Sequence, residues 1–332
     1  MRVVAAPDTF RGTASARDVA AAVGRAAWEH GWDCDEVPVA DGGEGFLDAL
    51  GGPNRTSTVT GPLGDAVVAG WRLDGKRAVI ESALASGLLL VGGAEGNDPI
   101  AASTYGTGEL IAAAAEAGAR RILVGIGGSA TTDGGLGALR AIHPPARLRG
   151  IELVVACDVR TRFVDAAEVF APQKGATAAQ VQLLKGRLQR LVQVYLEDHG
   201  VDVSDVEGAG GAGGLAGGLA AIGADLVEGF EVVAEELDLW SRIEGADLVI
   251  TGEGFLDEQS FEGKVVGGVA ALAAEADVPV VAVVGQVLDG IAPDGIEVVS
   301  LVERFGEAAA FERTTRCIEE VVAGLLAGFS RS

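Results

Sequence analysis

The stretch GIGGSATTDGG (residues 125–135) carries the strongest indication of the fold. It follows the apolar run at residues 122–124 and leads into residues 136–139, which are typical of a helix start. A strand, a glycine-rich turn and a helix N-terminus together form an anion site, because backbone N–H groups converge there and the helix dipole favours negative charge. The same pattern also fits a tight strand-to-helix turn with polar caps. It matches neither a Walker A loop nor a G-x-G-x-x-G dinucleotide fingerprint.

Polar segments also close other apolar runs of the chain. They comprise residues 7–13, 41–45, 158 and 252–257. If these runs are parallel strands, their polar ends meet at the carboxyl edge of a sheet, where open α/β sheets bind ligands. One such aspartate would fit a helix cap, whereas several carboxylates at several strand ends indicate a metal–phosphate site.

Apolar runs alternate with helical patterns along most of the chain. Near-continuous runs, such as residues 246–252 and 278–284, predict strands that are covered on both faces. Strands that alternate with helices predict a wound, mostly parallel α/β sheet of the Rossmann or flavodoxin type. A helix is expected after the capping-box pattern at residues 15–18, and another from residue 180 to residue 198.

Residues 56–80 have a different sequence pattern from the long apolar runs. Three short β-prone runs are separated there by turn sequences at residues 61–65 and 74–75, which predicts antiparallel strands in a second α/β lobe. The expected domains are residues 1–50, 116–199 and 239–332 for the wound domain, and residues 51–115 and 200–238 for the second lobe. The glycine-rich residues 207–218 fit either a flexible linker or a second loop of close backbone approach.

Composition limits the partners and the compartment. The net charge of −23, from 25 basic and 48 acidic residues, argues against binding to nucleic acid or to an anionic membrane surface. The three cysteines are widely spaced and form no C-x-x-C motif, so neither a disulfide framework nor a metal cluster is expected. An N-terminus without a signal-peptide pattern, and apolar runs shorter than the ~20 residues of a membrane span, predict a cytoplasmic protein. The oligomeric state is left open.

The chain resembles the bacterial class I glycerate kinases in eight segments, which occur in that family's order from about residue 3 to about residue 285. They are APDTFRGT (6–13), VADGGEGF (39–46), STYGTGELI (103–111), GIGGSATTDGG (125–135), ACDV (156–159), FAPQKGAT (170–177), GAGGAGGLAGGL (208–219) and the segment 248–264. The resemblance implies ATP-dependent, Mg²⁺-dependent phosphorylation of D-glycerate at the 2-hydroxyl. It also implies two α/β domains with the active site in the cleft between them.

The chain departs from this family at three places. Arg11 stands where the family usually has lysine, Phe255 stands where it usually has arginine, and residues 160–165 replace a glycine-rich Asn-Pro-Leu loop. These departures keep an alternative open: a substrate-shifted or non-catalytic member that binds a nucleotide or a sugar acid. A nicotinamide-dependent dehydrogenase is disfavoured by the missing fingerprint and by the many strand-end carboxylates.

Phosphoryl transfer needs bound phosphate, neutralised charge and a carboxylate that positions or deprotonates the hydroxyl. The predicted ATP-binding residues are Gly127, Gly128, Ser129, Thr131, Lys174 and Lys264. The predicted catalytic residues are Asp8, Asp41 and Asp133 as candidate bases, together with Arg11, which can bind the substrate carboxylate bidentately. The predicted Mg²⁺ ligands are Asp158, Glu253 and Asp257. For any one of these residues, a helix cap or a surface ion pair is the alternative.

Overall fold

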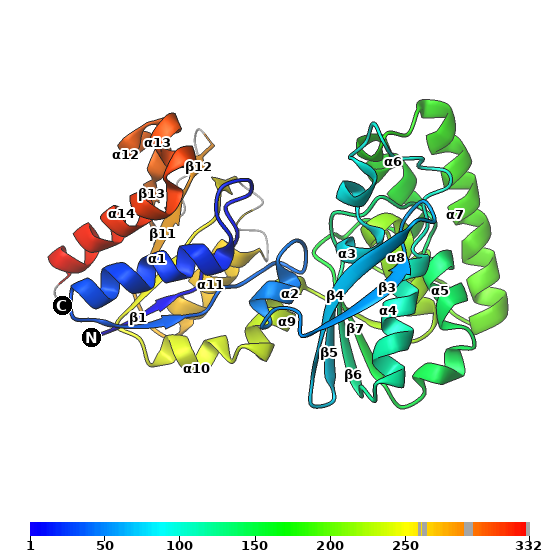
Figure 1. The fold of residues 1–332 in the computed structure, drawn as a ribbon, viewed down its shortest axis with the longest axis horizontal. Coiled ribbons are helices and arrows are strands. Elements are labelled where there is room, and N and C mark those ends of the chain that lie inside the picture. Colours follow the sequence, from blue (N-terminus) through cyan, green and yellow to red (C-terminus); the bar gives the residue numbers. More distant parts are fainter. Residues whose placement is uncertain (258–259, 261–263, 289–294, 330–332) are drawn as a thin grey trace. The chain divides into compact units, whose positions relative to one another are not determined.

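The computed structural model describes residues 1–257, 260, 264–288 and 295–329. The chain forms two compact units (Figure 1). Unit 1 comprises Met1–Asp41, Asp48–Leu50 and Phe230–Ser332, and unit 2 comprises Gly42–Leu47 and Gly51–Gly229. In sequence, unit 2 is therefore inserted into unit 1.

Unit 1 contains a parallel sheet with the strand order β13-β11-β9-β1-β2. The strands are β1 (Arg2–Ala5), β2 (Asp33–Glu36), β9 (Leu248–Thr251), β11 (Val280–Val284) and β13 (Glu297–Ser300). β1 pairs with β2 on one side and with β9 on the other. Along the chain this is the 2-1-3-4-5 order of flavodoxin-like sheets, in which the direction of strand addition reverses at the first strand. The predicted wound parallel sheet is confirmed.

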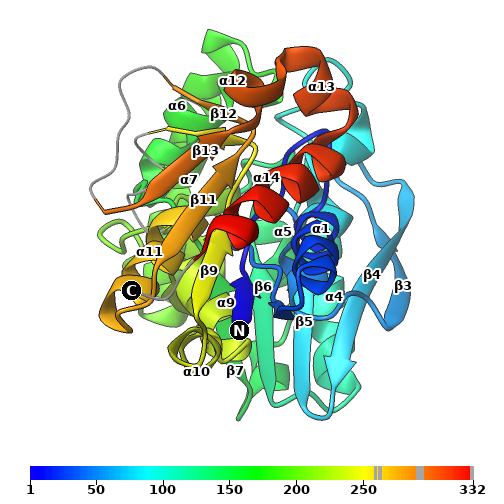
Figure 2. The ribbon, with the colours of Figure 1, turned by 90° about the vertical axis from the view of Figure 1, so that its left-hand side faces the viewer.

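Helices cover both faces of this sheet (Figure 2). The helices described in this part of the chain are α1 (Ala16–Glu29), α9 (Gly229–Glu236), α10 (Leu239–Glu244), α11 (Val265–Glu275), α12 (Leu301–Phe305), α13 (Glu307–Glu312) and α14 (Thr314–Gly328). The short helix α2 (Phe46–Ala49) contains residues of both units. A short parallel pair, β10 (Phe255–Leu256) and β12 (Gln286–Val287), follows β9 and β11.

Alternation along β11 shows how the two faces are filled. Val283 belongs to the apolar core formed with Val23 of α1 and Ile318 of α14. The neighbouring Val284 belongs to a separate core with Val266 of α11. Successive strand residues point to opposite faces of a sheet, so a strand with helices on both faces appears in the sequence as a continuous apolar run.

The sequence-predicted start of α1 is confirmed in atomic detail. The hydroxyl of Ser15 accepts a hydrogen bond from the Asp18 N–H at 3.1 Å. In return, the Asp18 carboxylate accepts from the Ser15 N–H at 3.2 Å. This reciprocal capping box satisfies backbone donors that a helix start would otherwise leave unpaired, and it fixes where the loop after β1 ends.

Unit 2 contains a mixed sheet with the strand order β3-β4-β5-β6-β7-β8. The strands are β3 (Arg55–Thr60), β4 (Ala66–Asp74), β5 (Arg77–Glu81), β6 (Arg121–Gly125), β7 (Glu152–Ala156) and β8 (Asp225–Val227). β3, β4 and β5 are antiparallel neighbours, whereas β5, β6, β7 and β8 are parallel. The three antiparallel strands predicted within residues 56–80 are therefore confirmed.

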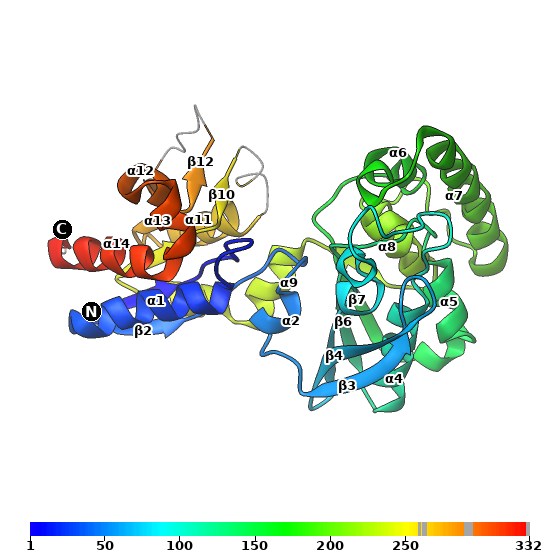
Figure 3. The same cartoon turned by 45° about the horizontal axis from the view of Figure 1, so that its top comes forward.

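The helices of unit 2 pack around this sheet (Figure 3). They are α3 (Ala83–Ser86), α4 (Tyr105–Glu116), α5 (Leu136–Ile142), α6 (Ala166–Phe170), α7 (Ala178–His199) and α8 (Gly211–Ala221), with 3₁₀ turns η1 (Leu88–Val91), η2 (Pro145–Leu148), η3 (Phe163–Asp165) and η4 (Pro172–Lys174). α7 confirms the helix predicted from the spacing of its apolar residues. None of the described helices has the length and the apolar character that a membrane span requires.

The structure places residues 116–199 in unit 2, and not with residues 1–50 as expected from the sequence. The physical reason is strand pairing: β6 pairs in parallel with β5, and β7 pairs with β6. These strands therefore extend the sheet that the antiparallel hairpins begin. Residues 230–238, expected in the second lobe, belong to unit 1.

The glycine-rich segment at α8 is a loop of close backbone approach, not a flexible linker. Residues 212–214 have left-handed backbone angles inside the helix, and the Gly213 carbonyl accepts the Gly134 N–H at 3.0 Å. A Cβ atom on Gly218 would lie 2.6 Å from the Gly134 carbonyl oxygen. Glycine is needed here because the backbone of α8 contacts the backbone of the loop after β6.

Gly218→Ala should therefore lower the free energy of unfolding by about 1–3 kcal/mol, since the added methyl group overlaps a neighbouring carbonyl. Gly186→Ala is the matched control, because Gly186 lies in α7 and an added Cβ would meet open space there. The control should raise stability by about 0.5–1 kcal/mol through helix propensity. Urea denaturation measures both; a Gly218→Ala protein as stable as the parent would contradict the close-approach interpretation.

Candidate functional site

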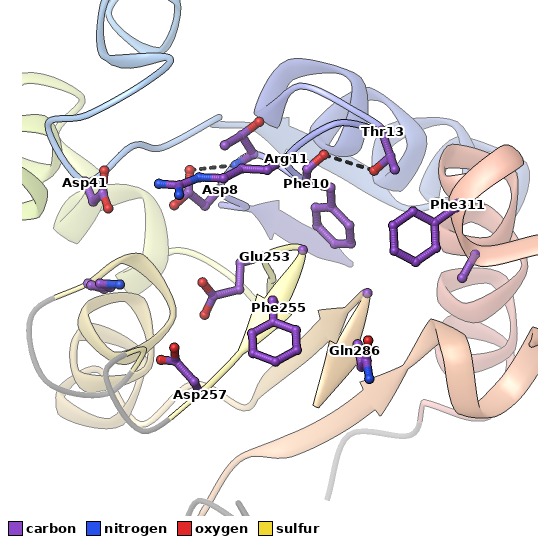
Figure 4. A pocket seen from close by; sticks show the side chains of 15 residues that line it. Asp8, Phe10, Arg11, Thr13, Asp41, Glu253, Phe255, Asp257, Gln286 and Phe311 are labelled. Atoms are coloured by element: carbon purple, nitrogen blue, oxygen red, sulfur yellow. Dashed lines mark hydrogen bonds between the residues drawn. The ribbon is translucent and has the colours of Figure 1, made fainter. Parts of the chain in front are cut away.

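Beyond the carboxyl ends of β1, β2 and β9, the segments that follow remain hydrogen-bonded to one another through their backbones. These bonds fix the positions of the carboxylates of Asp8, Asp41 and Glu253. The N–H of Asp8 donates at 2.8 Å to the carbonyl immediately before Glu253. On the other side, the N–H of Val39, two residues before Asp41, donates to the carbonyl of Pro7 at 3.0 Å. Asp8 therefore lies where the sheet order reverses, between the segments that carry Asp41 and Glu253 (Figure 4). Such reversal points are where open α/β sheets bind ligands.

Burial and neighbouring charge make Asp8 difficult to ionise. Burial, followed by the Asp41 carboxylate, raises the pKa of Asp8 to about 8, and Glu253 acts in the same direction. Two groups oppose this shift: the N–H of Thr9, which donates to Asp8 Oδ1 at 2.6 Å, and the guanidinium of Arg11. A carboxyl group that titrates near neutral pH inside a cavity is a candidate general base.

Glu253 and Asp257 supply carboxylates on the β9 side. Burial raises the pKa of Glu253, against the Ser260 hydroxyl and the Lys264 ammonium, which lower it. The Oε1 atom of Glu253 is buried and has no hydrogen-bond partner among the described residues. Asp257, by contrast, accepts from the N–H and the hydroxyl of Ser260 at 3.1 and 3.3 Å. Glu253 thus keeps an oxygen available for a ligand.

These groups line a cavity of about 290 Å³ in unit 1 (Figure 4). Its charged side chains are Asp8, Arg11, Asp41, Glu253, Asp257 and Lys264. Phenylalanine rings lie at the other end of the cavity from Asp41. Two of them, Phe255 and Phe311, are 45% and 54% exposed. The cavity therefore combines an excess of negative charge with an uncovered aromatic wall.

The carboxylates of the cavity fit a metal ion whose coordination is completed by a bound phosphate and water. In the part of the chain that the structure describes, no three His, Cys, Asp or Glu side chains are placed to hold a metal by themselves. Mg²⁺ does not need such a cage, because it commonly uses one or two carboxylates with phosphate oxygens and water. The unpartnered oxygen of Glu253 is suited to this arrangement.

A second candidate site lies in unit 2, in the loop that follows β6. The backbone N–H groups of Gly127, Gly128 and Ser129 have no acceptor within the described ranges. Gly128 has a positive φ of 56°, and its carbonyl accepts the Leu88 N–H at 2.7 Å. Successive free N–H groups form an anion-binding concavity. The hydroxyls of Ser129 and Thr131 bond to each other at 2.9 Å.

Asp133, a predicted base, is instead engaged in capping two helices. Its Oδ2 accepts from the N–H and the hydroxyl of Thr104, both at 2.9 Å, and from the Gly137 N–H at 3.1 Å. Its Oδ1 accepts from the Gly135 N–H at 3.1 Å. The starts of α4 and α5 are thereby joined, and the amides of α5 that were expected to bind an anion are already occupied. With its oxygens occupied by these donors, Asp133 is placed to hold the loop and the two helix starts rather than to contact a substrate hydroxyl.

Two other predicted residues have structural contacts in unit 2. The Oδ1 atom of Asp158 accepts the Gly229 N–H at 2.7 Å, at the start of α9. Lys174 is buried, and its Nζ donates to the Thr131 carbonyl at 2.6 Å. Burial lowers the pKa of Lys174 to about 8, while the Asp133 charge acts in the opposite direction. Lys174 therefore supports the loop from inside the protein.

The structure divides the predicted site residues between the two units. Those that line the unit 1 cavity are Asp8, Arg11, Asp41, Glu253, Asp257 and Lys264. Those in unit 2 are Gly127, Gly128, Ser129, Thr131, Asp133, Asp158 and Lys174. Residues 258–259 and 261–263 of the last family-like segment lie outside the described residues.

Sequence reasoning missed several residues of the cavity wall, most of them apolar. Phe10, Gln286, Ala310 and Phe311 also line it. Phe10 stands inside the family-like segment 6–13, and its position between Asp8 and Arg11 was a usable signal. Phe311 lies in α13, far from any motif, and a single phenylalanine in an amphipathic helix gives no indication of a binding role.

Comparisons with known proteins identify the relatives of this chain. The sequence model of the glycerate kinase family matches residues 3–144 and 142–327. A glycerate 2-kinase from Escherichia coli (strain K12) is 41% identical over 331 residues, covering 88% of this chain and 87% of that protein. A glycerate kinase from Bacillus subtilis (strain 168) is 40% identical over 370 residues, covering 96% and 97%. A solved structure from Salmonella typhimurium LT2, named as a glycerate kinase 2, superposes with a TM-score of 0.83 at 36% identity and covers 99% of each chain.

The raised pKa of Asp8 predicts a pH-dependent effect on stability. A carboxyl whose pKa is higher in the folded state contributes stability at pH values below its unfolded pKa, and this contribution is lost as the pH rises through about 8. Asp8→Asn should therefore match the parent protein near pH 4 and exceed its Tm at pH 8 by about 2–4 °C or more. Thermal unfolding from pH 4 to pH 8 measures this. Glu197→Gln, on the exposed side of α7, should leave the pH dependence unchanged, and an Asp8→Asn curve parallel to the parent's would refute the assignment.

Proposed function

Because the chain belongs to the glycerate kinase family and is therefore a kinase, we propose that it transfers the γ-phosphoryl group of ATP to the 2-hydroxyl of D-glycerate, with Mg²⁺ as the metal ion. The observation that carries this proposal is the position of Asp8. It is a half-buried carboxyl at the reversal point of a wound sheet, flanked by two further carboxylates, with a pKa of about 8.

Asp8 is the proposed general base. As the substrate oxygen forms its bond to the γ-phosphorus, the hydroxyl proton passes to the Asp8 carboxylate, and the bond to the ADP oxygen breaks. A base with a pKa near the working pH is both ionised often enough and basic enough to take a proton. Asp133 is not assigned this role, because its oxygens accept from helix amides and from Thr104.

Glu253 is the proposed metal ligand, and Asp41 or Asp257 is proposed as a second carboxylate ligand. A cavity with four carboxylates and two cations repels polyphosphate unless a divalent cation offsets the charge. Mg²⁺ would supply that neutralisation and orient the phosphate oxygens. Asp158, expected as a metal ligand, is a weaker candidate because it accepts the first N–H of α9 and belongs to unit 2.

Arg11 and Lys264 are proposed to bind the anionic groups of the reactants. Arg11 is exposed on the loop after β1 and can bind a carboxylate through two parallel hydrogen bonds. Lys264 stands immediately before the first turn of α11, where the helix dipole adds to its positive charge. In unit 2, the free N–H groups of residues 127–129 are proposed to hold ATP phosphates.

The assigned base predicts a characteristic pH profile. Since Asp8 is active only when ionised, kcat/KM should rise about tenfold per pH unit toward pH 8 and then level off. Asp8→Asn should lower kcat by about 10²–10⁴-fold and abolish this rise. Glu253→Gln should increase the Mg²⁺ concentration needed for half-maximal rate by at least about tenfold, a loss of roughly 1.4 kcal/mol.

Steady-state kinetics at several pH values and Mg²⁺ concentrations measure these effects. Glu197→Gln serves as the control, because its carboxylate is exposed in α7 and lies outside the cavity. Near-parental activity of both Asp8→Asn and Glu253→Gln would reject the role assignment.

The exposed Phe255 gives a second candidate function, phosphorylation of a related hydroxy acid with a less polar end. ADP release with Mg²⁺, ATP and a panel of hydroxy acids separates the two functions; we expect D-glycerate to be turned over. If a different acid is preferred and Phe255→Arg restores D-glycerate turnover, the substrate has shifted. If no acid in the panel stimulates ADP release, the chain is a non-catalytic binder and the proposed function is wrong.

A further inference from the structure

Lys174 makes an unusual contact beneath the loop after β6. It ends the 3₁₀ turn η4, and the residue is only 3% exposed. Its Nζ donates to the carbonyl of Thr131 at 2.6 Å. Burying an ammonium group costs much more free energy than burying a neutral one, unless its charge is put to use.

The adjacent carbonyl of the loop is held by a neutral group. The Nδ2 of Asn97 donates to the Ala130 carbonyl at 3.0 Å and to the Lys174 carbonyl at 2.9 Å. Two successive loop carbonyls are thus bound from inside the protein, by two side chains that are also linked to each other. Because Asn97 holds its carbonyl without a charge, hydrogen bonding alone does not explain a buried cation at position 174. The Asp133 carboxylate favours the charged form of Lys174 and raises its pKa against the effect of burial.

The free N–H groups lie just before these held carbonyls. The amides of Gly127, Gly128 and Ser129 have no acceptor in the described part of the chain. The contact at Thr131 is connected to these residues through Ser129, whose hydroxyl accepts the Thr131 N–H at 3.0 Å and bonds to the Thr131 hydroxyl at 2.9 Å. A positive charge beneath the same loop favours an anion in front of it.

We propose that Lys174 is a positioning residue for the phosphates of the nucleotide: it fixes the loop through the Thr131 carbonyl, and its buried charge strengthens anion binding without contact to the phosphate. Asn97 performs the positioning part alone, at Ala130. The inference rests on the proposed function, since it assigns the 127–129 amides to ATP phosphates.

Binding of inorganic tripolyphosphate and of ATP, measured by titration calorimetry, tests this role. Lys174→Met removes both the hydrogen bond and the charge, and should weaken the Kd for both ligands by about tenfold or more. Lys174→Gln keeps a donor and removes the charge, so its loss should be intermediate. The KM for D-glycerate should stay within about twofold of the parent value, because Lys174 lies in unit 2 and not in the unit 1 cavity.

A merely structural role would give a different result. It would lower Tm and the active fraction, and hence kcat, while the folded fraction kept the parental Kd for tripolyphosphate. Amide hydrogen exchange adds a second readout, since the hydrogen-bonded amides of Ala130 and Thr131 should exchange faster in Lys174→Met than in the parent. Lys185→Gln is the matched control: Lys185 also lies in unit 2, where it pairs with Glu168 at 2.9 Å, and the variant should bind tripolyphosphate like the parent.

Asn97→Ser keeps the test valid if Lys174→Met does not fold, because it leaves the lysine in place and removes the donor to Ala130. It should weaken tripolyphosphate binding in the same direction by a smaller factor. Parental affinity in folded Lys174→Gln and Asn97→Ser proteins would overturn the inference, as would a parent protein that binds no tripolyphosphate. A parent protein that turns over ATP while these variants bind normally rejects this inference alone, whereas a parent without ATP turnover rejects the proposed function.

Discussion

The burial of Asp8 beside two other carboxylates is the constraint on which the unit 1 site depends. Backbone hydrogen bonds beyond the strand ends hold Asp8 between the segments of Asp41 and Glu253. This position follows from the strand order, in which β1 lies between β2 and β9. Burial and these neighbours disfavour its charge, which costs stability in the folded protein. The same unfavourable charge favours the binding of a cation or a proton at the site, because either one neutralises a carboxylate. Strain of this kind is commonly concentrated where function requires it.

Both units place polar groups at the carboxyl ends of parallel strands, but they use different chemistry. In unit 1 the groups are side-chain carboxylates, which suit a metal ion and a hydroxyl proton. In unit 2 they are backbone N–H groups at residues 127–129, which have no acceptor in the part of the chain that the structure describes. A kinase needs both kinds of group, because it must activate the acceptor hydroxyl and bind the polyphosphate of the donor.

Local patterns in the sequence predicted much of this architecture, and non-local pairing explains what they did not predict. The capping box at Ser15 and the hairpins of residues 56–80 depend on neighbouring residues, and both were found. The apolar runs of β6 and β9 look alike, and only their partners, β5 and β1, assign them to different sheets. The same limit applies to the carboxylates. Asp8 and Asp133 each lie in a loop between a strand and a helix, but Asp133 also accepts from the N–H and the hydroxyl of Thr104, a contact 29 positions away that its own segment does not reveal.

The insertion of unit 2 into unit 1 has a consequence for biosynthesis. The N-terminal strand bonds to residues about 245 positions later, as between Arg2 and Asp247, so β1 and β2 leave the ribosome long before β9 exists. Unit 2 is nearly continuous and can close its core first, since domains usually fold as units during translation. In that interval β1 has an open edge. The acidic sequence of β2, Asp33–Glu36, protects the opposite edge of this strand pair, because charges on an edge strand oppose its pairing with other chains. The β1 edge is then the one to which β9 is added.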